Sequence, residues 1–226
     1  ERNLFLGSCK GCSEMFISKS KYLNGLQCPK LLWILYNDKG KIPPIPSSQQ
    51  AIFDQGHEVG RLAQSLFPGG IEIEGDPYDF KKLLAATQAA LRLRKPIFEP
   101  AFEHRNAFAR PDILNPVGSD LWDIIEVKGA TSVKEVYLHD IALQRYTYEG
   151  AGLNIRKTIL LLINNQYIRK GIIDPESFYL QEDVTSAVSE LLSGVEGNLD
   201  RLTAIIKLKN CPDAAIGTHC TYPYEC

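Results

Sequence analysis

The 226-residue sequence lacks several features that would assign it directly to a class. No apolar run approaches the roughly 20 residues that a membrane-spanning helix needs, and the short apolar stretch 158–163 instead predicts a buried strand. The formal net charge is −2, so no overall positive charge indicates nucleic-acid binding, and any such site must be local. The hydrophobic content of 44% is ordinary for a globular protein, and the length suits one large domain.

Export signals are also missing from the N-terminal segment, residues 1–14, which has neither the basic region nor the long apolar region of a signal peptide. We expect this segment to be an added or upstream leader, followed by a single domain over residues 15–226. Without an export signal, six cysteines favour thiols in a reducing compartment, so we expect a cytoplasmic protein with no membrane contact. Cys9 and Cys12 form a C-x-x-C pair inside the leader, and we interpret it as incidental.

Hydrophobic periodicity and turn residues predict the order of the elements. We expect helices over 19–36, 49–66, 78–94, 132–150 and 182–208. Cys28, next to Pro29, lies either inside the first of these segments or at a break in it. We expect strands over 71–74, 96–102, 107–114, 121–127 and 157–164, and a brief hairpin at 166–173. Short connections favour an antiparallel meander for the three strands between residues 96 and 127. The order helix, three strands, helix, strand predicts an α/β fold with a mixed sheet between helices.

The stretch 110–128 carries the strongest chemical signal in the sequence. Two β-rich runs flank a turn-rich segment at 115–120, which predicts a hairpin. Glu126 and Lys128 are two residues apart and share a strand face, and Asp112 on the partner strand can lie beside Glu126. Two carboxylates and an ammonium suit a magnesium or manganese ion that binds a phosphate oxygen. Such a pattern also arises by chance in a chain with 23% charged residues, where charged groups usually line a solvated edge.

Several motifs in order resemble one family. Residues 110–112 (Arg-Pro-Asp) and 126–128 (Glu-Val-Lys) resemble the PD-(D/E)xK signature. Residues 56–58 (Gly-His-Glu) resemble the histidine motif of the RecB-type nuclease branch, and Gln144-x-x-x-Tyr148 resembles its Q-x-x-x-Y motif. With cysteines on both sides of this core, the chain resembles the CRISPR-associated iron–sulfur exonucleases of RecB type and their uncharacterised longer relatives. The resemblance implies a restriction-endonuclease-like core with helical N- and C-terminal additions joined by a cysteine cluster.

The same resemblance implies roles for individual residues. Magnesium or manganese would be bound by His57, Asp112, Glu126 and the backbone carbonyl of Val127. Lys128 would be the catalytic lysine, and Gln144 and Tyr148 would position DNA or the lysine. Other readings stay open, because a lone histidine in a helix is more often a surface residue and Tyr148 can simply be a core residue.

The cysteines outside the leader are far apart in the sequence, at Cys28, Cys211, Cys220 and Cys226. Four thiolates are the usual complement of a [4Fe–4S] cluster, which would join the two ends of the chain. Zinc is the alternative, but its usual paired C-x-x-C spacing is absent between these four. The fourth ligand is either Cys211 or a cysteine beyond Cys226, where the family commonly has another.

These observations together predict a metal-dependent DNA nuclease, most simply a single-strand exonuclease that acts in CRISPR-type defence or DNA repair with partner proteins. Exposed aromatic residues could stack bases, and the candidates are Tyr22, Trp33 and Tyr148. Two alternatives come from other classes. One is a catalytically idle DNA-binding or adaptor module with a structural cluster, and the other is a zinc-stabilised protein of unrelated function.

Overall fold

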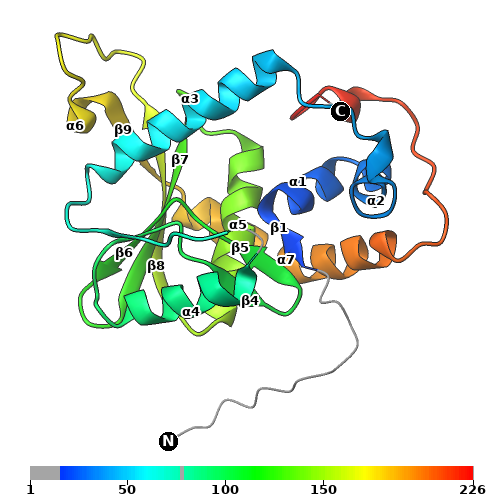
Figure 1. Cartoon of the computed structure of the whole chain (residues 1–226), viewed down its shortest axis with the longest axis horizontal. Coiled ribbons are helices and arrows are strands. Elements are labelled where there is room, and N and C mark those ends of the chain that lie inside the picture. Colours follow the sequence, from blue (N-terminus) through cyan, green and yellow to red (C-terminus); the bar gives the residue numbers. More distant parts are fainter. Residues whose placement is uncertain (1–15, 77–78, 226) are drawn as a thin grey trace, which may run out of the picture.

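The computed structural model describes residues 16–76 and 79–225, and Figure 1 shows their arrangement. The expected leader, with Cys9 and Cys12, lies outside the described residues, as does Cys226. A six-stranded sheet has the order β2-β3-β6-β7-β8-β9, and a three-stranded sheet has the order β1-β5-β4. Both sheets mix parallel and antiparallel pairs, and helices pack against them. The predicted α/β class, with a mixed sheet between helices, is therefore confirmed.

The strands are short at the edges and long in the centre of the large sheet. Their bounds are β1 (Ile17–Ser18), β2 (Ile71–Glu72), β3 (Ile97–Phe98), β4 (Phe102–His104), β5 (Ala107–Ala109), β6 (Ile113–Val117), β7 (Leu121–Lys128), β8 (Asn154–Ile163) and β9 (Tyr179–Asp183). The helices are α1 (Lys19–Gln27), α2 (Pro29–Asn37), α3 (Ser47–Gln64), α4 (Phe80–Leu91), α5 (Glu135–Gly150), α6 (Pro175–Phe178) and α7 (Thr185–Ile206), with short 3-10 turns η1 (Lys39–Lys41) and η2 (Thr218–Cys220).

The predicted hairpin over 110–128 is confirmed as β6 and β7. The two strands pair antiparallel, with Ile113 opposite Ile125 and Val117 opposite Leu121. Gly118 takes φ +57° at the turn, a left-handed conformation that suits glycine. The guanidinium of Arg94 donates to the carbonyls of Val117, Gly118 and Leu121, which fixes the turn from outside.

The central strand β7 is buried on both faces of the sheet. Ile125 faces a cluster that includes Ala63 of α3, while Ile124 faces the larger core cluster with Ile141 of α5. Figure 1 shows α3 on one side of the large sheet and α5 with α7 on the other. Because side chains alternate along a strand, Glu126 projects on the same side as Ile124, toward α5.

Strands in the region 96–114 differ from the prediction of one continuous meander. β3, β6 and β7 are antiparallel neighbours in the large sheet, but β4 and β5 form a separate hairpin in the small sheet. The chain leaves the large sheet at Glu99, which has φ +49°, and at Pro100, which has no backbone N–H. Apolar and polar residues continue to alternate through this bend, so the sequence pattern does not show that the chain passes to a second sheet here.

The segment expected to be helical over 19–36 has a break at Cys28, which is extended at φ −154°, and Pro29 begins a second helix, α2. One further prediction needs correction. Residues 166–173, all of them described, carry no strand, so the predicted hairpin is wrong. Ile168 and Ile172 are 76% and 92% exposed, so these apolar side chains are not buried against the sheet as a hairpin strand would require. The strand that pairs with β8 is instead β9.

The two ends of the described chain meet, as the predicted helical additions require. Gln27 at the end of α1 donates from Nε2 to the carbonyls of His219 and Tyr224, at 2.7 and 2.6 Å. Trp33 donates to the carbonyl of Leu208. In Figure 1 the C-terminal segment, in red, returns to the blue helices α1 and α2. Among the described residues, no helix has the length and apolar character needed to span a membrane.

Candidate active site

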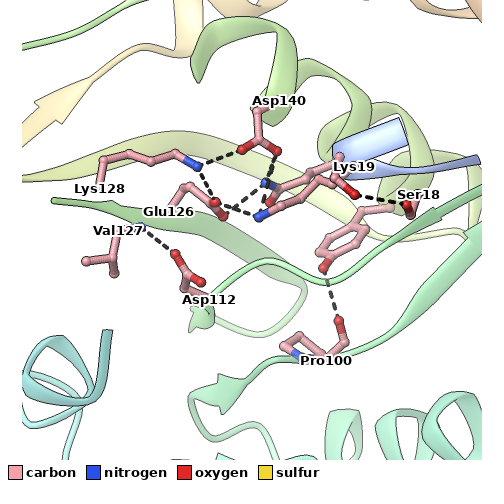
Figure 2. A network of polar contacts seen from close by, with 11 residues as sticks. Ser18, Lys19, Pro100, Asp112, Glu126, Val127, Lys128 and Asp140 are labelled. Carbon is pink, nitrogen blue, oxygen red and sulfur yellow. Dashed lines mark hydrogen bonds and ion pairs between the residues drawn. The ribbon is translucent and has the colours of Figure 1, made fainter. Parts of the chain in front are cut away.

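The β6–β7 hairpin brings together the acidic residues and the lysine predicted from sequence. Asp112 stands immediately before β6, and its Oδ2 accepts a hydrogen bond from the backbone N–H of Val127 at 2.7 Å. Lys128 Nζ lies 2.8 Å from Glu126 Oε1, which confirms that these two side chains share one face. The register of the hairpin therefore places all three functional groups at one end of the sheet (Figure 2).

Helix α5 completes this cluster from the other side. Asp140 Oδ2 lies 2.7 Å from Lys128 Nζ. Gln144, one turn further along α5, donates from Nε2 to Glu126 Oε2 at 3.0 Å and to Asp140 Oδ1 at 2.9 Å. Residues four apart on a helix project from the same face, so α5 presents Asp140 and Gln144 together. Gln144 thus holds the two carboxylates in fixed positions relative to each other.

Lys19, the first residue of α1, enters the same cluster from a distant part of the chain. Its Nζ lies 2.6 Å from Glu126 Oε1 and 3.8 Å from Asp140 Oδ1. Both Lys19 and Lys128 point at Glu126 in Figure 2, with Asp140 above them. We call Asp112, Glu126, Lys128, Asp140, Gln144 and Lys19 the acidic–lysine cluster.

The pKa values of the two hairpin carboxylates, Glu126 and Asp112, are shifted in opposite directions. Burial alone would raise the pKa of Glu126, but Lys128 and Lys19 outweigh it and hold that pKa at about 2. Burial and the charge of Glu126 raise the pKa of Asp112 to about 7. Burial lowers the pKa of Lys128, yet the surrounding carboxylates of Glu126, Asp140 and Asp112 raise it well above its usual value. Glu126 is therefore a fixed anion, whereas Asp112 ionises near neutral pH.

Asp112 also lines a cavity of about 210 Å³ that reaches α3. His57, exposed on α3, lines the same cavity, with Glu72 and Glu99 nearby on its wall. Glu99 is ion-paired to Arg110 at 2.8 Å. The structure thus places the predicted ligands His57 and Asp112 on one cavity, whereas Glu126 is buried and does not line it.

Carboxylate and amide oxygens of the cluster and the cavity are the groups that a divalent cation would bind. Among the described residues, no three histidine, cysteine or acidic side chains form a ready metal-binding group. Both oxygens of Glu126 accept hydrogen bonds, from the two lysines and from Gln144. Two features nevertheless suit a hard cation with bound water. Asp112 has a raised pKa, and Gln144 Oε1 is buried with no hydrogen-bond partner in the described chain.

Tyr148, predicted to position DNA or the lysine, lies in the core. Its ring is fully buried and packs on Phe102 with centroids 4.2 Å apart, and its hydroxyl donates to the carbonyl of Pro100 at 3.2 Å. Tyr22 is also fully buried. Neither ring can stack a base, so that part of the aromatic prediction is wrong for both residues. Tyr148 instead braces α5 against the segment between β3 and β4.

Asp140 and Lys19 are the cluster members that sequence reasoning missed. Asp140 had a signal, because Asp140, Gln144 and Tyr148 follow one another at four-residue spacing on one helix face. Lys19 had none, since it is 107 residues from Glu126 and lies in an ordinary helix start. Only the packing of α1 beside α5 brings it to the cluster.

Three of the four predicted cluster cysteines are described. Cys28 is buried, while Cys211 and Cys220 are partly exposed, and all three are free thiols. The hydrogen bonds of Gln27 to His219 and Tyr224 bring the immediate neighbours of Cys28 and Cys220 together. The described cysteines do not by themselves form a three-ligand group. Cys226, the fourth predicted ligand, lies outside the described residues.

The fold and the cluster define this chain as a mixed α/β domain with buried carboxylates and lysines at the end of its central hairpin. No family model and no curated relative matches it. Similar solved structures include an alkaline exonuclease, LHK-Exo, from Laribacter hongkongensis, at 12% identity and TM-score 0.38, over 86% of this chain and 91% of that one. They also include SSO0001, at 12% identity and TM-score 0.42, over 83% and 78%. At these values the assignment depends on the site geometry alone.

Proposed function

We propose that this protein is a metal-dependent deoxyribonuclease that hydrolyses phosphodiester bonds. The observation that carries the proposal is the convergence of Asp112, Glu126 and Lys128 at one end of the β6–β7 hairpin, beside a cavity that His57 also lines. Carboxylates beside a lysine supply both the ligands for a hard cation and a positive charge for a phosphate.

In this proposal His57, Asp112, Glu126 and the Val127 carbonyl would hold magnesium or manganese. A bound divalent ion supplies Lewis acidity and lowers the pKa of its water. The chain's own residues do the remaining work. Asp140 holds the Lys128 ammonium in place, and Lys128 offsets charge that develops on the phosphate. Gln144 fixes the orientation of Glu126, and its unpartnered Oε1 is a ready acceptor for a water in the site.

We further propose single-stranded DNA as the substrate, exonucleolytic cleavage, and a role in CRISPR-type defence or DNA repair with partner proteins in the cytoplasm. These finer statements rest on the motif resemblance of residues 56–58, 110–112, 126–128 and 144–148. A [4Fe–4S] cluster held by Cys28, Cys220, Cys226 and either Cys211 or a further cysteine belongs to the same proposal. The bonds from Gln27 to the C-terminal segment support it, because they bring the two cysteine-bearing ends together.

The first experiment is digestion of end-labelled single-stranded DNA in Mn²⁺ by anaerobically purified protein, compared with Asp112→Ala and Lys128→Met. We expect each substitution to reduce the rate by at least about 100-fold, because each removes a charge that acts in the transition state. Lys157→Met is the matched control. Lys157 is paired with Asp183 on the far strand β9 and should leave activity unchanged. The pattern of labelled products gives the direction of digestion.

A catalytically idle DNA-binding or adaptor module is the alternative function. The engagement of both Glu126 oxygens by lysines and Gln144 favours it, because such a carboxylate is closed to a metal until a partner leaves. If the wild type and both site variants are equally inert in Mn²⁺ while DNA still binds, the nuclease proposal is wrong and the adaptor function replaces it.

A further inference from the structure

Lys19 and Lys128 share one oxygen of Glu126 but are held differently. Lys128 has two close partners, Glu126 at 2.8 Å and Asp140 at 2.7 Å, and its side chain is 19% exposed. Lys19 has one close partner, Glu126 at 2.6 Å, while Asp140 is 3.8 Å away and the side chain is 28% exposed. Of the two lysines, Lys19 is therefore the less firmly held and the more accessible from solvent.

The backbone of Lys19 is nevertheless fixed. Ser18, the residue before it, pairs with Phe108 in the parallel pair of β1 and β5. Helix α1 begins at Lys19 and packs against α5 and α7, and Tyr22 in its next turn is fully buried. The four-carbon side chain can thus change partners while its Cα stays in place.

Coordination of a divalent cation by Glu126 requires one of its present partners to withdraw. A cation at Glu126 would repel both ammonium groups, and Lys128 stays bound to Asp140 when it loses Glu126. Lys19 has only the distant contact with Asp140 to retain it. Withdrawal of Lys19 toward solvent is therefore the less costly way to open Glu126.

We infer that Lys19 is a second substrate-binding lysine of this site. It neutralises Glu126 through their ion pair, and with a metal held by Glu126 its ammonium would be free to bind a nonbridging phosphate oxygen of DNA. The inference rests on the proposed nuclease function. Charge supports it: when Asp112, Glu126 and Asp140 are all ionised, they exceed Lys19 and Lys128 by one negative charge. A divalent cation turns this into one positive charge, which one phosphodiester neutralises.

The test compares Lys19→Met and Lys19→Arg with Lys21→Met as the matched control. Lys21 lies on the same helix, but its ammonium sits over the Tyr36 ring at 4.3 Å and contacts no member of the cluster. Mn²⁺ affinity is measured without DNA. Binding of single-stranded DNA is then measured against salt concentration with Ca²⁺ in place of Mn²⁺, intact DNA being verified on gels, and kcat and KM are measured in Mn²⁺.

For Lys19→Met we expect Mn²⁺ to bind at least about threefold more tightly, because a competing cation is gone. The slope of log affinity for DNA against log salt is negative, and we expect its magnitude to decrease by about 0.7, the value for one phosphate contact on a single strand. KM should rise by about tenfold, and Lys19→Arg should restore most of the DNA affinity. Lys21→Met should match the wild type in every measurement.

Two results would overturn the inference. If Lys19→Met leaves the salt slope unchanged, or weakens Mn²⁺ binding, while the wild type cleaves DNA, then Lys19 is a structural ion-pair partner only and the nuclease proposal stands. If the wild type neither binds Mn²⁺ nor cleaves DNA, the proposed function is wrong and the inference falls with it.

Discussion

At the residue scale, the contrast between Asp112 and Glu126 is the most informative feature of the site. Glu126 has two lysines and an amide around it and remains ionised, whereas Asp112 has one backbone N–H as its hydrogen-bond donor and a pKa near 7. A buried carboxyl group whose ionisation lowers the stability of the fold is typical of a ligand-binding or catalytic site. A bound cation would stabilise the ionised form of Asp112, because the two lysines only partly compensate for burial and for the charge of Glu126.

Asp112→Asn should therefore stabilise the metal-free protein at pH 8. The folded pKa of about 7 lies above the ordinary 3.8, so wild-type stability falls as pH rises from about 4 to 7 and stays lower above that. Each pH unit in that interval lowers the free energy of unfolding by at most about 1.4 kcal/mol. Asparagine keeps an acceptor for the Val127 N–H and does not titrate. Denaturant unfolding in chelator across pH 4–8 measures the difference.

Asp183→Asn provides the control with the opposite sign. Bonds from Lys157 and Thr185 hold the pKa of Asp183 at about 2, so its contribution to stability is present above about pH 4 and is lost as pH falls toward 2. Its removal should lower stability at pH 8, although modestly because the pair is exposed. If Asp112→Asn also lowers the free energy of unfolding at pH 8, the prediction that ionised Asp112 destabilises the protein is wrong.

At the element scale, the position of α1 decides whether Lys19 reaches the cluster, and a glycine sets that position. A Cβ at Gly25 would lie 2.6 Å from Leu202 Cδ2 of α7 and 2.9 Å from Leu32 Cδ2 of α2. These distances are too short for contact, and both neighbours are fully buried leucines with little room to move. The three helices therefore meet at the one residue that has no side chain.

Gly25→Ala should lower the free energy of unfolding by about 1–3 kcal/mol, the usual effect of overpacking. Gly197→Ala on α7 is the matched control, because a Cβ there meets nothing within 4 Å and alanine favours a helix over glycine. It should stabilise the protein by roughly 0.5–1 kcal/mol. Chemical denaturation of both variants gives the comparison. Equal effects of the two substitutions would contradict tight packing at Gly25.

At the scale of the whole molecule, the two ends of the described chain are held together across the domain. Gln27 donates to two carbonyls of the C-terminal segment, and Asn37 donates to the carbonyl of Ile206. Cys28 follows Gln27, and Cys220 follows His219. A cluster bound by these thiolates would add covalent links where hydrogen bonds already join the ends.

Protein purified without oxygen should contain about four iron atoms per chain if the cluster forms. Cys28→Ser should remove most of this iron, since a buried ligand is lost, while Cys9→Ser in the expected leader should leave it unchanged. Loss of iron in Cys211→Ser would identify Cys211 as the fourth ligand, and unchanged iron would exclude it. Iron and sulfide analysis with visible absorption makes the measurement. A colourless protein with stoichiometric zinc would establish the zinc alternative.

The sequence by itself determined the parts of this protein that depend on local pattern. Alternation along 121–127, the turn-rich segment 115–120 and helical spacing in 132–150 predict the hairpin and a helix after it. The hairpin fixes Asp112, Glu126 and Lys128 relative to one another, while the packing of α5 on the sheet brings Gln144 to Glu126. Residues two apart on a strand or four apart on a helix share a face whatever surrounds them.

Only the tertiary structure decided the rest, because it depends on contacts between distant segments. It placed Tyr148 in the core, split the region 96–114 between two sheets, and left Ile168 and Ile172 exposed. It also brought Lys19 to Glu126 across 107 residues of chain. The packing of α1 against α5 and α7 sets that contact, and no local periodicity in the sequence encodes it.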